Sequence, residues 1–540
     1  MVKSNIPTHL DKVKDQSLTA EQVADLAVEL AGEILSVANE NQKVSERYQG
    51  WKMARMMHDP LGKTLTLAMA DQVFRSPTDS RSASQFRYLV GEYGIPAYLP
   101  LHEQLAMRMG AISSAVAPDM VMPAITWKMR GESSEVILPS EDEQLIPHLR
   151  KRKKQGIRMN INQLGEAILG EEEAAKRMDQ VVARLESPDC EYISVKISAI
   201  FSQINLVAYD HTLEEIKKRL RRLYRTAQAN TFVQDDGTRS PKFVNLDMEE
   251  YRDLHLTCDA FRQVLMEEEF MTLRAGIVLQ AYLPDSHEVQ KELTAWARQR
   301  VDQGGATIKI RIVKGANLAM EEVEASLHDW ELAPYSCKAD VDANYKRMVH
   351  YGCHPENAEV VQLGIASHNL FEITYAMVLR AGYGVEKYVE FEMLEGMANH
   401  QARAVRDAVG GLLLYAPVVK KEDFHSAIAY LVRRLDENTS EENFLHDIFG
   451  MKKGDASWEK QRKMFLAACK RCDEVSTKPA RTQDRTTEQY ELDVDAPFHN
   501  AADTDWSLRH NMRWILQVVE DYRAQTLEPI PVQIGGAFEY

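Results

Sequence analysis

Eight polar or ionisable residues in the middle of the chain stand near the ends of short apolar runs. They are Lys196, Asp247, Gln280, Arg311, Lys314, His368, Glu392 and Tyr415. Such groups are costly to bury without a partner, so their recurrence at equivalent places indicates that they gather around one ligand. The pattern favours a binding or catalytic site that is built from scattered side chains.

Several chemistries stay open for single members of this set. Lys196, in the segment VKIS, has the residue type for a Schiff base, but it equally fits an ion pair or a side chain that reaches out to solvent. Asp247 suits a metal, a general base or a partner for a neighbouring cation. His368 with Asn369 fits either a ligand contact or the cap of the following helix.

Standard cofactor and metal motifs are absent from the sequence. No G-x-G-x-x-G follows an expected strand, and Gly62-Lys63-Thr64 is not the end of a P-loop, because Met57 occupies the position of the first glycine. No H-E-x-x-H is present, and the Cys469–Cys472 spacing without a second pair is typical of chance on a helix. We therefore expect no metal, and either no cofactor or an organic cofactor held by scattered residues.

Short β-rich segments alternate with amphipathic helical segments through the middle of the chain. The expected strands are 157–164, 192–200, 242–248, 276–283, 307–313, 359–367, 387–394 and 411–419. Eight repeats of strand and helix favour an α/β fold that closes into a (β/α)8 barrel. Active sites of such barrels lie at the carboxyl ends of the strands, which is where the eight residues stand.

The two ends of the chain differ from this pattern. Residues 19–41 carry apolar residues at helical spacing, with Thr19 as the expected N-cap. We expect an all-helical accessory domain at 1–145, the barrel at 146–460, and a C-terminal linker region at 461–540. Within that last region, a polar stretch precedes a helix and the short β-like segment PIPVQIGG.

Composition limits the classes of partner. The net charge of −16 repels nucleic acid, so we read the basic run at 150–154 as a solvated linker and the run at 217–225 as a solvated helix face. Six scattered cysteines fit a reducing cytoplasm. The longest apolar run, 412–419, is too short to span a bilayer, so any membrane contact is expected to be peripheral.

Five motifs in order resemble one family. RIVKGANL at 311–318, ASHN at 366–369, FEMLEGM at 391–397, YAPV at 415–418 and YLVRRLDEN at 430–438 are similar to motifs of the proline dehydrogenase domain of bacterial bifunctional proline utilization A enzymes. The resemblance covers residues 150–450. It implies L-proline as substrate, hydride transfer from C5 to the flavin N5, and Δ1-pyrroline-5-carboxylate as product, with electrons passed to a membrane quinone.

The same resemblance implies noncovalent FAD in the mouth of the barrel. The cofactor-binding residues that it implies are Gln280, Arg311, Val313, Lys314, Gly315, Ala316, Lys338, Ser367, His368, Asn369 and Glu437. The residue types agree with this role. Gly315 permits close approach of the backbone, and the cation Lys338 suits a pyrophosphate.

For the substrate, the resemblance implies Lys196, Leu394, Tyr415, Arg433 and Arg434, with Asp247 and Arg311 completing the catalytic set. Two guanidinium groups suit the proline carboxylate. Neighbouring residues on a helix face different ways, so Arg433 and Arg434 reach one ligand only if their helix lies over the barrel mouth.

Some positions depart from the family pattern. Asn317-Leu318 stands where many relatives have Tyr-Trp, Glu392 stands where some have glutamine, and three extra residues separate YAPV from YLVRR. The stretch from DTDWSL to PIPVQIGG resembles the join to an aldehyde dehydrogenase half, so we expect a fragment with the first activity alone. No ribbon-helix-helix pattern opens the chain, so the resemblance implies no DNA binding.

Two classes of alternative stay open from the sequence. One is another barrel enzyme, either a Schiff-base aldolase using Lys196 or a flavoenzyme similar to methylenetetrahydrofolate reductase. The other is a non-catalytic docking protein. The oligomeric state is also open, with a homodimer among the options.

Overall fold

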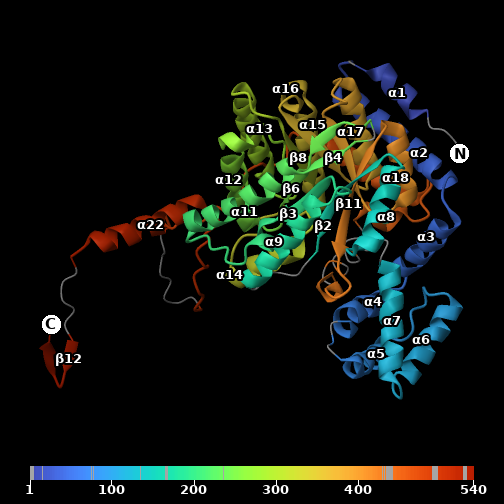
Figure 1. The fold of residues 1–540 in the computed structure, drawn as a ribbon, viewed down its shortest axis with the longest axis horizontal. Helices are drawn as coiled ribbons and strands as arrows, with labels where there is room; N and C mark the ends of the chain where they lie inside the picture. Colours follow the sequence, from blue (N-terminus) through green and yellow to red (C-terminus); the bar gives the residue numbers. More distant parts are fainter. Residues whose placement is uncertain are drawn as a thin grey trace.

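The computed structural model shows a β/α barrel flanked by helices at both ends of the chain (Figure 1). It describes residues 5–14, 16–74, 76, 78–133, 136–164, 168, 170–234, 236–427, 430, 432, 434, 442–488, 497–526 and 532–539.

Eight parallel strands form the barrel. They are β2 (Ile157–Gln163), β3 (Tyr192–Lys196), β6 (Phe243–Asp247), β7 (Gly276–Gln280), β8 (Ile308–Val313), β9 (Val361–Ala366), β10 (Val389–Leu394) and β11 (Leu412–Val419). They follow one another around the sheet in chain order, and β11 pairs with β2 from Leu412↔Ile157 to Val418↔Gln163, which closes the barrel. A two-residue strand, β1 (Leu138–Pro139), pairs in parallel with the carboxyl end of β11. The predicted (β/α)8 barrel is confirmed.

The strands alternate between an apolar outer face and a polar inner face. In β8, Ile308, Ile310 and Ile312 are buried in the apolar core that the strands share with the helices. Lys309 and Arg311 between them make ion pairs with residues of β10 and β6, which are not neighbours of β8 in the sheet. Contacts between strands that are not adjacent can only cross the interior, so the barrel is filled with charged and amide side chains.

Helices surround the barrel on its outside. The helices of the repeats are α9 (Glu171–Glu186), α10 (Ile197–Ile200), α11 (Tyr209–Ala229), α12 (Leu254–Leu265), α13 (Ser286–Asp302), α14 (Leu318–His328), α15 (Lys338–Cys353), α16 (Pro355–Ala358), α17 (Leu370–Gly382) and α18 (Asn399–Val409). Short 3-10 turns η2 (Tyr251–Asp253), η3 (Glu268–Phe270) and η4 (Phe424–Ala427) and a small hairpin, β4 (Thr231–Val233) with β5 (Arg239–Pro241), occupy connections.

The N-terminal helices α1 (Ile6–Val13) and α2 (Ala20–Glu40) lie on the outside of the helical ring, with α2 against α17 and α18. Helix α2 begins at Thr19 in a capping box with Gln22, as predicted. Its apolar residues belong to the same buried core as the barrel, and Thr374 of α17 donates a hydrogen bond to the carbonyl of Ala27 at 2.7 Å. Helix α2 therefore forms a second layer over α17.

The next helices form a lobe beside the barrel (Figure 1). They are α3 (Val44–Met57), α4 (Pro60–Ala68), the π-helix η1 (Met69–Val73), α5 (Asp79–Tyr93), α6 (Leu101–Ser113) and α7 (Pro118–Ser133). Residues Leu65, Met69, Phe86 and Met122 belong to a small core of this lobe that is separate from the barrel core. Helix α8 (Asp142–Lys153) leads from the lobe into β2.

After the barrel, α20 (Phe444–Ile448) and α21 (Ala456–Arg471) return to its side, where Trp458 and Phe465 pack on Phe371 with ring centroids 4.6 and 5.5 Å apart. Helix α22 (Arg509–Ala524) extends away from the barrel, and a hairpin of β12 (Val532–Ile534) and β13 (Ala537–Glu539) follows it (Figure 1).

Three sequence expectations need correction. The strand expected at 192–200 ends at Lys196, because Ile197–Ile200 form the helical turn α10. The strand expected at 276–283 ends at Gln280. The basic run at 150–154 is not a linker: Arg150 to Lys153 form the last turn of α8, where cations offset the negative end of the helix dipole.

Arg300 of α13 ties together the turns beneath the barrel. Its side chain is fully buried and donates hydrogen bonds to the backbone carbonyls of Leu265, Phe270, Met271, Leu273 and Ala306. Each buried carbonyl left without a donor costs about 1–3 kcal/mol.

We expect Arg300→Met to lower the free energy of unfolding by about 4 kcal/mol, since water can replace only part of the lost donors. Urea denaturation followed by circular dichroism measures this loss. The matched control is Arg298→Met, two residues earlier in α13. It removes a single hydrogen bond to the Glu356 carbonyl and should lower the free energy of unfolding by less than about 1 kcal/mol. Equal losses in the two variants would contradict the role given to Arg300.

Candidate functional site

The candidate site lies where the parallel strands end. Lys196, Asp247, Gln280 and Leu394 are the last residues of β3, β6, β7 and β10, and Val313 is the last residue of β8. Because all the strands run the same way, their carboxyl ends meet at one mouth of the barrel. Lys196, Asp247 and Gln280 are thus brought to one place as predicted, whereas Arg311, Glu392 and Tyr415 lie within β8, β10 and β11 rather than at their ends.

Arg311, Asp247 and Tyr415 form the centre of this site. The Arg311 Nη2 donates to Asp247 Oδ1 at 3.0 Å, and the Tyr415 hydroxyl donates to Asp247 Oδ2 at 2.9 Å. The Arg311 guanidinium also lies over the Tyr415 ring, 4.9 Å from its centroid. Asn162 donates to the Tyr415 hydroxyl at 2.5 Å. Each polar group is therefore held from two sides.

The protonation states of this centre follow from burial and charge. Burial alone would lower the pKa of Arg311, but the carboxylates of Asp247 and Glu392 outweigh it and raise that pKa. Burial, followed by the Asp247 charge, raises the pKa of Tyr415 well above its usual value. Arg311 is thus a permanent cation, and Tyr415 is a neutral hydrogen-bond donor.

Lys196 has a carboxylate partner that the sequence reasoning missed. Its Nζ contacts Glu249 Oε1 at 2.5 Å, and Ser198 donates to the other Glu249 oxygen at 3.1 Å. The backbone carbonyl of Glu249 accepts from Gln280 at 3.2 Å and from Asn317 at 2.8 Å. Glu249 lies two residues beyond Asp247, and its position just after a strand end was the available signal.

A cluster of buried charges lies between β8, α15 and α17. Lys314 contacts Asp342 Oδ1 at 2.5 Å and Glu372 Oε1 at 3.2 Å, and Lys338 contacts Asp342 Oδ2 at 2.5 Å. Lys346, which is fully buried, contacts Glu372 at 2.7 Å. Three cations thus face two carboxylates, so the cluster can take a further anion such as a phosphate.

The backbone next to this cluster approaches a ring closely. Gly315 has a φ of +129°, a conformation that favours glycine. A Cβ at this position would lie 2.5–2.7 Å from ring atoms of Tyr282, so a larger residue does not fit. Ala316 beside it is exposed, while Val313 is half-buried.

His368 is neutral and has one nitrogen to offer. Its Nε2 accepts a hydrogen bond from the Leu394 backbone N–H at 2.9 Å, which places the proton on Nδ1. Burial, with a smaller effect of nearby Arg434, lowers the pKa of His368 to about 3. Its buried Nδ1 has no hydrogen-bond partner among the described residues, and neither does Gln280 Oε1 or Arg311 Nε. Buried orphans of this kind indicate a ligand.

The helix cap after β9 is supplied by Asn369, one of the two readings that the sequence left open for that pair. Asn369 Oδ1 accepts from the N–H of Phe371 at 3.0 Å, and Ser367 Oγ accepts from the N–H of Asn369 at 3.0 Å. Both side chains therefore shape the turn that presents His368.

The last predicted motif is only partly described. Arg434 Nε donates to the Tyr430 hydroxyl at 3.2 Å, and its charge contributes to the lowered pKa of His368. Arg433 and Glu437 lie outside the described residues.

Three residues that depart from the family pattern have described surroundings. Asn317 is buried and holds the Glu249 carbonyl, while Leu318 is 43% exposed. Glu392 is buried inside the barrel next to Lys309 and Arg311.

A hollow of about 840 Å³ opens at the opposite, amino ends of the strands, lined by Arg158, Glu191, Lys309 and Glu390 among others. Barrel enzymes do not place their chemistry at that end. The described residues hold no group of three or more His, Cys, Asp or Glu side chains placed to bind a metal. In the same ranges, no helix has the length and apolar character needed to cross a membrane.

Known proteins resemble this chain over the barrel. The curated protein PutA of Salmonella typhimurium, described as bifunctional, is 26% identical over 371 residues, which are 64% of this chain and 26% of that protein. Proline dehydrogenase 2 of Bacillus subtilis is 22% identical over 59% of this chain and 90% of its own length. The chain thus spans about a quarter of the length of the PutA relative.

Solved structures agree. Proline utilization A from Corynebacterium freiburgense is 41% identical with a TM-score of 0.62 over 72% of this chain and 36% of its own. The enzyme from Bdellovibrio bacteriovorus, inactivated by N-propargylglycine, is 26% identical with a TM-score of 0.74 over 96% of this chain and 50% of its own. The family model described as Proline dehydrogenase matches residues 145–447, more than half of the chain. The family resemblance read from the sequence is confirmed, and the chain belongs to the proline dehydrogenase family.

Proposed function

We propose that this chain is an FAD-dependent dehydrogenase that oxidises L-proline to Δ1-pyrroline-5-carboxylate, the first step of proline catabolism to glutamate. The observation that carries the proposal is the network of Arg311, Asp247 and Tyr415 at the carboxyl mouth of a barrel of this family. The network presents a fixed cation and a neutral hydroxyl side by side. A substrate with both a carboxylate and a ring suits such a surface.

The residues present fit a flavin dinucleotide. The surplus cation of the cluster around Lys314 and Lys338 matches a pyrophosphate, and Gly315 lets the backbone beside that cluster pack against the Tyr282 ring. The buried orphans on His368, Gln280 and Arg311 match hydrogen-bonding groups of the cofactor. We assign FAD binding to Gln280, Arg311, Val313, Lys314, Gly315, Ala316, Lys338, Ser367, His368 and Asn369, and to Glu437, which lies outside the described residues. When bound, FAD supplies the hydride acceptor.

The substrate side of the site follows from charge and shape. Arg434, together with Arg433 outside the described residues, and the Lys196 ammonium attract the proline carboxylate. Tyr415 and Leu394 wall the ring, and a pocket of this kind discriminates by about 1–3 kcal/mol per methylene. Oxidation removes a proton from the nitrogen and a hydride from C5 as the C5=N bond forms. Asp247 holds Arg311 and Tyr415 in place during that transfer.

The ion pair of Lys196 bears on the Schiff-base alternative. The Lys196 Nζ is engaged by Glu249 Oε1 at 2.5 Å, so attack on a carbonyl would have to break this contact. This contact favours an electrostatic role for Lys196. We therefore keep proline oxidation as the proposed function.

The acceptor of the electrons is proposed to be a membrane quinone, reached from the cytoplasm by peripheral and transient contact. The acidic net charge of −16 argues against nucleic acid as a partner. A homodimer is compatible with the proposal, which does not depend on it.

Purified protein supplied with FAD should show a flavin absorbance that L-proline bleaches under anaerobic conditions. D-proline should leave it oxidised, since a mirror image cannot place its carboxylate and C5 on the same fixed groups at once. A flavin that stays oxidised with L-proline would refute the substrate. Failure to take up FAD would refute the cofactor.

Tyr415→Phe removes the hydroxyl that donates to Asp247 and accepts from Asn162, and it should lower kcat/KM for proline at least about tenfold, because one hydrogen bond contributes roughly 1.4 kcal/mol. Steady-state assays with an artificial electron acceptor measure the change. Tyr388→Phe is the matched control, because Tyr388 precedes β10 at the other end of the barrel. An unchanged Tyr415→Phe enzyme would remove this hydroxyl from the mechanism.

His368→Leu should weaken FAD binding about tenfold, the loss expected for one hydrogen bond to a ligand. Fluorescence titration of the protein with FAD gives the dissociation constant. His350→Leu serves as the control. His350 lies on the outside of α15, and its one hydrogen bond among the described residues joins its Nε2 to the Tyr383 hydroxyl at 3.1 Å. Equal affinities in the wild type and His368→Leu would show that the orphaned Nδ1 does not serve the cofactor.

A further inference from the structure

Glu392 lies directly beneath the catalytic arginine. Its side chain is 2% exposed, with Oε2 3.8 Å from Arg311 Nη1 and Oε1 2.6 Å from Lys309 Nζ. Apart from these two cations, no group in the described part of the chain donates a hydrogen bond to either carboxylate oxygen. The carboxylate is therefore compensated by the charges of the two flanking cations, and a neutral side chain of the same shape would lose that interaction.

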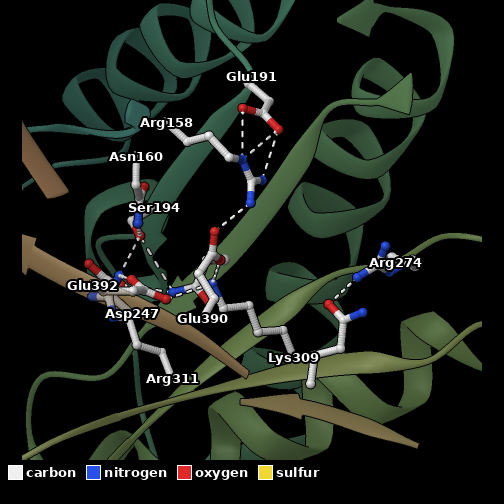
Figure 2. A network of polar contacts seen from close by, with 12 residues as sticks. Arg158, Asn160, Glu191, Ser194, Asp247, Arg274, Lys309, Arg311, Glu390 and Glu392 are labelled. Carbon is white, nitrogen blue, oxygen red and sulfur yellow. Dashed lines mark hydrogen bonds and ion pairs between the residues drawn. The ribbon is translucent and has the colours of Figure 1, made fainter. Parts of the chain in front are cut away.

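The ion pair of Glu392 and Lys309 continues as a ladder of alternating charges through the barrel (Figure 2). Lys309 also contacts Glu390 at 2.6 Å, and Glu390 contacts Arg158 at 2.5 Å. Arg158 in turn pairs with Glu191 at 2.8 Å near the amino ends of the strands. Arg158 is 43% exposed but Lys309 only 4%, so the charges become more buried toward Arg311.

The electrostatics of Lys309 agree with this geometry. Burial alone would lower its pKa, but Glu390 and Glu392 outweigh burial and raise it. Lys309 is thus a fixed positive charge inside the barrel.

The neighbouring strand makes room for the pair. Gly364 lies in the middle of β9, where glycine costs stability because it has no side chain to pack. A Cβ at Gly364 would overlap the Glu392 carboxylate and lie 2.8 Å from Lys309 Cε. The glycine therefore fits the space that Glu392 and Lys309 occupy.

We propose that Glu392 is a positioning residue that acts through Arg311, and that Glu392 and Lys309 together set the reduction potential of the bound flavin. This inference rests on the proposed function. Reduction would bring negative charge to the flavin that we assign to Arg311, and charges in a dry interior act strongly on such a change. Glu392 opposes reduction, and Lys309 offsets part of that effect.

Midpoint potentials of the FAD-loaded full chain test the proposal. Glu392→Gln keeps the shape and removes the negative charge, so the potential should shift to a more positive value. Lys309→Met removes the positive charge and should shift it to a more negative value. The double variant should return close to the wild type, since the pair is neutral as a unit.

Glu390→Gln is the matched control. It makes the same charge change one step farther from Arg311, in a side chain that is 27% exposed, and should give a smaller positive shift. Unchanged potentials, or shifts of the same sign in Glu392→Gln and Lys309→Met, would overturn the proposal. If Lys309→Met does not fold, the comparison of Glu392→Gln with Glu390→Gln decides alone.

Reduction of the wild type and the same variants by L-proline distinguishes a failure of the proposed role of Glu392 and Lys309 from a failure of the proposed function. Flavin that L-proline reduces with unshifted potentials would refute the role of the pair and leave the proposed function standing. Flavin that L-proline does not reduce in the wild type would refute the proposed function, whatever the potentials are.

Discussion

The alternation of side chains along strands of a closed barrel is the constraint on which this structure depends. Each strand has one face toward the helices and one toward the barrel axis. Because the barrel is closed, every strand side chain points to one of these two sides. In β8 this alternation sends three isoleucines outward and Lys309 and Arg311 inward. Branched apolar side chains usually fill a barrel interior. Here it is filled by ions, which are tolerated because carboxylates on other strands meet them.

The same constraint explains the outer layer of helices. Helix α17 is buried around nearly its whole circumference, including Ile373, Ala376 and Met377. A helix that is apolar on all sides needs cover on the side away from the sheet. Helix α2 provides it, with the Thr374 hydroxyl satisfied by the Ala27 carbonyl. The N-terminal helix thus completes the core of the barrel.

Local signals were sufficient for much of this architecture. All eight strands could be predicted, because each is a short apolar run between helical patterns, and the Thr19 cap followed from residue type. Strand ends were less accurate: Ile197 and Ile200 continue the apolar character of β3 although the chain turns into a helix there. Propensity cannot locate that change, because both conformations bury the same side chains.

Several partners of the charged residues could not be predicted. The clustering of Asp247, Arg311 and Tyr415 was foreseen from strand ends and the family resemblance, but Glu249 for Lys196 and Glu392 for Lys309 were not. Lys196 and Glu249 come from the ends of the adjacent strands β3 and β6, whereas Lys309 and Glu392 face each other from β8 and β10, and several carboxylates lie at similar positions. Which acid meets which cation depends on strand tilt and register, which one strand's sequence does not contain.

The extent to which the interior polar groups are paired changes along the barrel axis. Toward the amino ends the ladder is closed, with Arg158, Glu390 and Lys309 all paired. At the carboxyl mouth the pairing is incomplete, and buried atoms of Arg311, Gln280 and His368 have no partner within the described residues. Unsatisfied buried groups cost stability, so they persist where a ligand can satisfy them. The end of the barrel that is less well satisfied by the protein itself is therefore the end at which binding gains most.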